Sequence, residues 1–172
     1  MEFGKLAVRL FSAVELMKPA KSGLQSNEFF LIDNFETLQG NFVVQPKYDG
    51  IRCQIHKSDE RVVIFSDEQR EIQDRFPGVV DAASKLKGAF IIDGEIIKIE
   101  EGRPERHDQV SAYVHSKTPP DDSAFHVEAF DLIFHDGQLD GRPLAERWAM
   151  LKELLPGRDG KIKLIQTMRS AG

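Results

Sequence analysis

The stretch Lys47-Tyr48-Asp49-Gly50-Ile51-Arg52 decides the fold, because one short apolar run ends just before it and another begins within it. Residues 42–45 form the first run. After the stretch, Ile51, Cys53 and Ile55 alternate with polar residues, which is the pattern of a half-buried strand. A lysine followed by Asp-Gly between two strands places an amine at a tight turn, where free backbone amides can meet a ligand.

Lys47 is therefore a candidate nucleophile. An unperturbed lysine has a pKa of about 10.4 and is protonated at neutral pH, so a nucleophilic lysine needs a neighbouring cation that favours its neutral form. Arg52 could supply that charge or hold a phosphate. Gly50 would let a ligand approach the backbone closely. On these residues alone, the alternative is a plain hairpin with a solvated lysine.

The rest of the chain predicts a mixture of strands and helices. Short apolar runs bounded by turn residues predict strands at residues 42–45, 51–55, 61–65, 90–92, 96–99, 125–134 and 162–166. The first three of these form an antiparallel meander in this interpretation. Helical spacing predicts helices over 74–86, ended by Gly88, and over 144–155, while residues 100–123 read as loop with room for a short helix. The predicted class is α+β.

Composition sets outer limits on function. The 23 basic and 28 acidic residues of this 172-residue chain give a net charge of −5. This charge excludes a protein that binds nucleic acid through a large overall positive charge. The single cysteine, Cys53, excludes an internal disulfide and a multi-cysteine zinc site, and it fits a reducing compartment. The five histidines lack ligand spacing and are interpreted as surface or loop residues. With no apolar run near 20 residues and no secretory signal, we expect a cytoplasmic protein without a membrane partner.

The Lys47 stretch resembles a known family. KYDGIR matches the signature K-x-D-G-x-R of the covalent nucleotidyltransferases, which are the ATP-dependent DNA ligases, RNA ligases and mRNA capping enzymes. Further motifs follow in the family's order: Phe65-Ser66, Phe76-Pro77, the Asp-Gly-Glu block ending at Glu95, the Phe-Asp-Leu block at Phe130, and Leu139-x-Gly141-x-Pro143-Leu144-x-x-Arg147. The last block resembles DNA ligases rather than capping enzymes. The resemblance spans residues 42–155 and implies antiparallel sheets flanking a nucleotide cleft, in an ATP-grasp-like ligase fold.

The resemblance also implies a role for each matching residue. Lys47 would attack the α-phosphate of ATP and become lysyl-AMP, and Gln45, at a position that is commonly Glu, would contact the adenine amine. Arg52 would contact the ribose or the nick, and Phe130 would stack on adenine. By residue type alone, Phe130 could equally be an ordinary aromatic residue of the core. Glu95 would hold the ribose hydroxyl or a Mg²⁺-bound water. The substrates implied are ATP and nicked double-stranded DNA, in replication, repair or recombination.

Two departures from the family pattern stand out. Ser66 is followed by Asp67 where the family has arginine, and Arg70 is the nearest substitute. The later E-G-x-x-x-K and K-x-K blocks do not occur before Gly172. We therefore expect residues 1–40 to be a lead and edge segment, and 41–172 an incomplete adenylation domain lacking those blocks and the OB-fold domain. Such a fragment should have little activity and could self-associate through an unpaired sheet edge.

Two other functions remain open at this point. One is an RNA ligase or a capping-type nucleotidyltransferase, which shares the lysine signature. The other is a non-catalytic remnant that binds a nucleotide or a partner protein.

Overall fold

The computed structural model describes residues 43–59, 61–118, 120–136, 139, 142–155, 157 and 160–169. Its strands are β1 Val43–Val44, β2 Ile51–Ser58, β3 Arg61–Ser66, β4 Phe90–Glu100, β5 Arg103–Pro104, β6 Phe125–His135, β7 Ile162–Leu164 and β8 Met168–Arg169. Its helices are η3 Gln73–Arg75, α1 Pro77–Ser84, α2 His107–His115 and α3 Leu144–Leu154. None of the described helices is long and apolar enough to cross a membrane.

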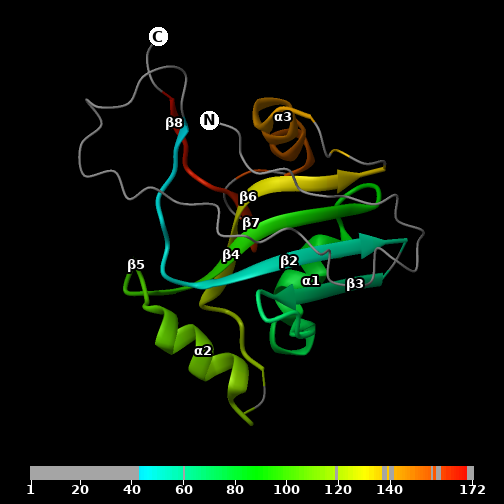
Figure 1. Cartoon of the computed structure of the whole chain (residues 1–172). Coiled ribbons are helices and arrows are strands. Elements are labelled where there is room, and N and C mark those ends of the chain that lie inside the picture. Colours follow the sequence, from blue (N-terminus) through cyan, green and yellow to red (C-terminus); the bar gives the residue numbers. More distant parts are fainter. Residues whose placement is uncertain are drawn as a thin grey trace.

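One sheet dominates the molecule, with the strand order β3-β2-β4-β6-β7 (Figure 1). The first four of these strands pair antiparallel, whereas β7 lies parallel to β6. The small strand β5 extends the sheet from β4, and β1 pairs with β8 in a separate two-stranded ladder. The Lys47 stretch connects that ladder to β2. It therefore lies between two sheets rather than inside a hairpin.

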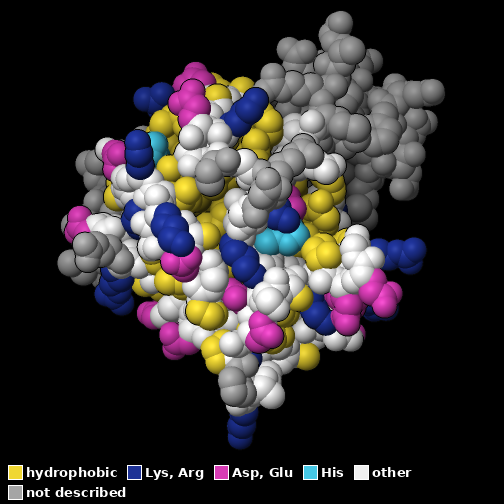
Figure 2. All heavy atoms as spheres, turned by 180° about the vertical axis from the view of Figure 1, so that it is seen from behind, with side chains coloured by type: hydrophobic (Ala, Val, Ile, Leu, Met, Phe, Trp, Pro, Cys, Tyr) yellow, Lys and Arg dark blue, Asp and Glu magenta, His cyan; other side chains and the backbone are white. Residues whose placement is uncertain are grey.

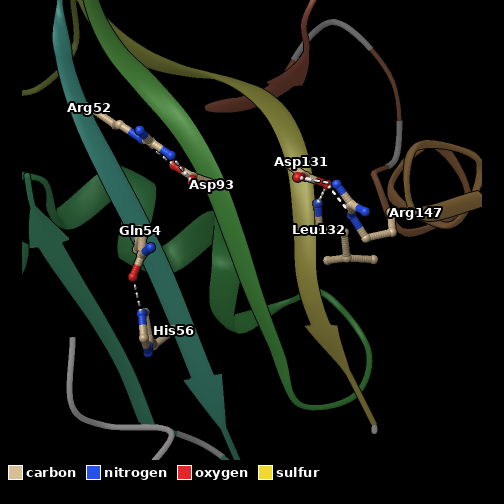
Figure 3. A network of polar contacts seen from close by, with 7 residues as sticks. All are labelled: Arg52, Gln54, His56, Asp93, Asp131, Leu132 and Arg147. Atoms are coloured by element: carbon tan, nitrogen blue, oxygen red, sulfur yellow. Dashed lines mark hydrogen bonds and ion pairs between the residues drawn. The ribbon is translucent and has the colours of Figure 1, made fainter. Parts of the chain in front are cut away.

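The two faces of the large sheet differ in chemistry. On β2, Ile51, Cys53 and Ile55 belong to the hydrophobic core, and the residues between them point to the opposite side because side chains alternate along a strand. Helices α1, α2 and α3 each contribute buried side chains to that core, namely Val79 and Ala83, Val110, and Leu151. The opposite face carries Arg52, Gln54 and His56 along β2 (Figure 3). On this face Arg52 meets Asp93 of β4, whereas His56 is buried and its ring packs against Phe65.

Local sequence explains where the helices begin. Pro77 stands in the first turn of α1, where its missing N–H and fixed φ are tolerated. The free amides of Gly78 and Val79 donate to Asp122 Oδ2 at 2.8 and 3.2 Å, so a carboxylate from another loop satisfies that helix end. Leu151 and Leu155 anchor α3 to the core.

Several predicted elements are confirmed. The β2–β3 hairpin, the long strand through Asp93 and Glu95, the strand ending near Phe134 and the helix from Leu144 all occur close to their expected bounds. The short helix that the sequence allowed within residues 100–123 is present as α2. Gly88 has a left-handed φ of +76°, but it does not end the helix as expected, because α1 already ends at Ser84 with Lys85 as its C-cap.

Three expectations were wrong. The sheet is mixed rather than wholly antiparallel, because β7 joins β6 in parallel register. The first strand of the expected meander pairs with β8, not with β2. The helix expected over 74–86 is split into η3 and α1, because the extended φ of −128° at Phe76 interrupts it. The expected lead segment 1–40 lies outside the described residues.

Candidate active site

Lys47 lies on the connection between β1 and β2, and its side chain is exposed. Burial raises the pKa of the Glu95 carboxyl on β4, and the positive charge of Lys47 acts against that shift. The exposed amine of Lys47 is open to a substrate from solvent.

Gly50 connects the Lys47 segment to Glu95. Its backbone N–H donates to Glu95 Oε1 at 3.1 Å, and its carbonyl oxygen accepts a hydrogen bond from Nδ1 of His107 at 2.6 Å. A Cβ atom at this position would lie 2.1 Å from the carbonyl oxygen of Ile96, so only glycine allows this approach to β4. The requirement for glycine here is a close backbone approach, as the sequence suggested, although the neighbour is β4 rather than a ligand.

Glu95 has a strongly perturbed carboxyl. Burial raises the pKa of its carboxyl from 4.5 to about 7. The Gly50 N–H and the charges of Lys47 and Arg52 oppose that shift, and Asp93 adds to it. A carboxyl poised near neutral pH is typical of functional sites.

Arg52 pairs with Asp93, which the sequence analysis did not foresee. Its Nε and Nη2 donate to the two carboxylate oxygens at 3.0 and 2.6 Å, and the pair bridges β2 and β4 (Figure 3). Asp93 stands two residues before Glu95 and is 3% exposed, so the arginine neutralises a buried charge. The guanidinium also lies 5.6 Å from the ring centre of Phe130. Among the residues that the structure describes, its Nη1 group has no hydrogen-bond partner.

Phe130 lies at an irregularity in β6. The pairing of β4 with β6 shifts register there, and Phe130 has no Cα partner on β4. A bulge of this kind redirects a side chain next to a site. Phe130 is half-buried rather than part of the core, which favours a ring that is available for stacking.

Asp131 fixes the chain directly after Phe130. Both of its carboxylate oxygens accept hydrogen bonds from Arg147 of α3 at 2.8 Å, and Oδ1 also accepts the Leu132 N–H at 2.8 Å (Figure 3). Arg147 was part of the motif noted in the sequence, but its partner was not predicted. The pair ties α3 to the strand that presents the aromatic ring.

The remaining predicted residues are less closely connected to this group. Gln45 Nε2 donates to Thr167 Oγ1 at 3.4 Å, beside the β1–β8 ladder. Arg70, the suggested substitute for the missing arginine, is exposed and pairs with Glu68 at 3.1 Å. The Asp67 backbone N–H donates to the carbonyl of Arg52 at 3.1 Å, so the turn after β3 does border the site.

ATP and Mg²⁺ each require particular donor groups in a site. Among the described residues, no group of three or more His, Cys, Asp or Glu side chains could hold a metal ion. Mg²⁺ is commonly held by one or two carboxylates together with substrate phosphates, and Glu95 fits that use, directly or through water. Lys47, Arg52 and Phe130 supply an amine, a cation and an aromatic ring, which is the chemistry that a nucleotide requires.

The described part of the face drawn in Figure 2 does not add a large basic region. Figure 2 shows one face of the molecule, on which Lys and Arg side chains are interspersed with Asp and Glu and with hydrophobic atoms. This mixture agrees with the net charge of −5.

The architecture and the lysine segment together define a nucleotidyltransferase-type ligase domain. The family model of the ATP-dependent DNA ligase domain matches residues 29–171, and the chain belongs to that family. A probable DNA ligase of Streptomyces griseus is 36% identical over 124 residues, which are 68% of this chain and 24% of that protein. A DNA ligase of Archaeoglobus fulgidus is 33% identical over 129 residues, covering 70% of this chain and 22% of that protein.

Solved structures show the same fold. Mycobacterial DNA ligase D complexed with ATP and MES superposes with a TM-score of 0.56 at 18% identity, over 74% of this chain and 40% of that one. A second ligase, Pmar-Lig_Pre, gives a TM-score of 0.60 at 16% identity, over 78% of this chain and 32% of that one. The chain thus spans about a quarter of the length of the curated relatives just described.

Proposed function

We propose that this chain is the adenylation portion of an ATP-dependent DNA ligase and that Lys47 carries AMP covalently. The observation that supports this most is the connection of the exposed Lys47 segment to Glu95 through the Gly50 N–H, at the predicted signature. The complete protein would pass AMP to the 5′-phosphate of a nick and join that end to the 3′-hydroxyl. DNA ligases among the matching relatives favour DNA over RNA as the substrate.

In the first step, Lys47 Nζ attacks the α-phosphorus of ATP. An N–P bond forms, the bond from the α-phosphorus to the bridging oxygen breaks, pyrophosphate leaves with the electron pair, and the amine loses a proton to solvent or to a neighbouring carboxylate. Glu95, with a pKa of about 7, is placed to accept that proton or to bind the ribose hydroxyl. Mg²⁺ would neutralise charge on the phosphates.

The other site residues bind and orient the nucleotide in this proposal. Phe130 stacks on adenine, and Gln45 contacts the adenine amine. Arg52 keeps its pair with Asp93 and offers Nη1 to the ribose or to the nick. Because a guanidinium carries five N–H donors, the two roles are compatible.

We propose the domain division made from the sequence as well. Residues 1–40 form a lead and edge segment, and 41–172 form part of an adenylation domain whose cleft is of the ATP-grasp-like ligase type. Activity of the chain alone should be weak, since phosphoryl transfer depends on many cations around the phosphates. Self-association through a sheet edge and a cytoplasmic location complete the proposal.

The deciding experiment is intact-mass measurement after incubation with ATP and Mg²⁺. We expect a covalent AMP adduct on the wild-type chain, even at low yield, and none on Lys47→Ala. Nucleotide binding without an adduct would instead indicate a non-catalytic remnant. With the complete protein, faster joining of nicked RNA than of nicked DNA would contradict the DNA assignment.

A further inference from the structure

The peptide group of Gly50 is held from both sides. Glu95 accepts its N–H at 3.1 Å, and the His107 ring lies 2.6 Å from its carbonyl oxygen. Because a carbonyl oxygen only accepts hydrogen bonds, Nδ1 of His107 must carry the hydrogen and act as the donor. Gly50 stands three residues after Lys47, so these two contacts set where the lysine segment leaves the sheet.

The backbone at Gly50 has little freedom on the side of β4. The position that a Cβ would occupy is 2.1 Å from Ile96 O and 2.9 Å from Ile97 Cγ2. Strand β4 therefore limits the movement of the segment on one side, and His107, at the start of α2, restrains it on the other. Removing the histidine would release the carbonyl side alone.

Helix α2 gives His107 a firm base. Val110 is fully buried, and the ring of Tyr113 packs against Phe125 with centroids 4.3 Å apart. The Tyr113 hydroxyl donates to the carbonyl of Arg75 at 2.8 Å. The helix is thus fixed to the core along its length, whereas His107 at its first residue is exposed and contributes nothing to that packing. Its contact with Gly50 is separable from the stability of the helix.

We propose that His107 is a positioning residue for nucleotidyl transfer, whose Nδ1–H holds the Gly50 carbonyl and so keeps Lys47 in line with the nucleotide. This inference rests on the function proposed above for Lys47. A positioning contact changes the rate of the chemical step more than the binding of ATP, and a displacement of about 1 Å can reduce a rate by about 100-fold.

The test is single-turnover adenylylation of the 172-residue chain, with ATP labelled at the α-phosphate and Mg²⁺. We expect His107→Phe, which keeps a ring and removes the donor, to lower the maximal rate by about tenfold or more. The ATP concentration for half-maximal rate should stay nearly the same. His107→Asn, whose side-chain N–H can take the place of Nδ1–H, should restore most of the rate.

The matched control is His115→Phe at the other end of α2. Nδ1 of His115 bonds to the carbonyl of Ser111 within its own helix at 2.8 Å, and its Nε2 lies 3.3 Å from Nη1 of the exposed Arg70. Neither contact reaches the Lys47 segment, so the loss of His115 should leave the rate unchanged. An unchanged rate in His107→Phe, an equal loss in His107→Asn, or an equal loss in His115→Phe would each overturn the proposal.

Hydrogen exchange without nucleotide separates this proposal from the proposed function. We expect the backbone amides of residues 49–51 to exchange faster in His107→Phe and at the wild-type rate in His107→Asn. If the wild-type chain forms no adduct, the function of Lys47 fails, and the exchange result still decides whether His107 holds Gly50. Unchanged exchange in His107→Phe would overturn the positioning role whatever the rates.

Discussion

Glu95 links folding to pH at the level of a single residue. Folding raises the pKa of its carboxyl from 4.5 to about 7, so between these values the folded chain holds a proton that the unfolded chain has lost. This stabilising contribution is fully present below pH 4.5 and is lost as the pH rises through 7. The charged form is the one that the Lys47 amine and the Gly50 N–H favour.

We predict that Glu95→Gln removes this pH dependence, because the amide does not ionise. The free energy of unfolding of the variant minus that of the wild type should increase as the pH rises from 4.5 to 7. This difference should level off about one unit above pH 7. Urea unfolding at a series of pH values measures it. Glu153→Gln, at an exposed position of α3, is the control for the chemical change itself. A flat difference for Glu95→Gln would contradict the prediction.

Among single residues, the sequence motifs identified more candidate site residues than side-chain chemistry alone did. Lys47, Arg52, Glu95 and Phe130 were singled out because their spacing matches a signature. The structure brings Arg52 to 5.6 Å from the Phe130 ring centre and joins the Lys47 segment to Glu95 through the Gly50 N–H. The pairing of Arg52 with Asp93 was not predicted, since a contact between residues 41 positions apart depends on strand register. His107 was interpreted as a surface or loop residue and it is exposed, but its contact with Gly50 was not predicted, because nothing in its spacing indicates that α2 begins beside Gly50.

Among the elements, α3 and β6 are joined by a pair of charges with little access to water. The side chains of Arg147 and Asp131 are 15% and 16% exposed. Arg142 and Glu146, at the start of the same helix, form an exposed pair at 3.5 Å with side chains 55% and 56% exposed. The two pairs therefore provide a direct comparison of ion pairs in different surroundings.

We predict that Arg147→Met lowers the free energy of unfolding by about 2 kcal/mol, because Asp131 loses both charged hydrogen bonds. Arg142→Met should change it by no more than about 0.5 kcal/mol. Urea unfolding at neutral pH gives both values. Equal effects would mean that Asp131 finds another partner or reaches water.

Element types were predictable and their partners were not. Periodicity identified β2, β4, β6 and α3 because each has a long, regular apolar pattern. The parallel partner of β6 is a three-residue strand, Ile162–Leu164, and its direction depends on where α3 returns the chain. The pairing of β1 with β8 depends on contacts between chain segments that are far apart, which no local pattern encodes.

For the whole molecule, the proposed nucleotide site predicts stabilisation by ATP. A ligand that binds only the folded state at about 100 times its Kd adds about 2.7 kcal/mol, which corresponds to a Tm increase of roughly 5–10 °C for a chain of this size. Calorimetry with and without ATP measures the shift. Phe130→Ala should reduce it by removing the stacking surface. An equal shift with inorganic triphosphate would show that adenine is not recognised.

The ladder that joins Val43 to Arg169 has a consequence for synthesis. A ribosome delivers residues in order, so the β2–β3 hairpin and the following strands can form while the partner of Val43 is still inside the exit tunnel. The amino-terminal flank of the Lys47 segment is therefore secured late, when β2, β3, β4 and β6 can already have paired.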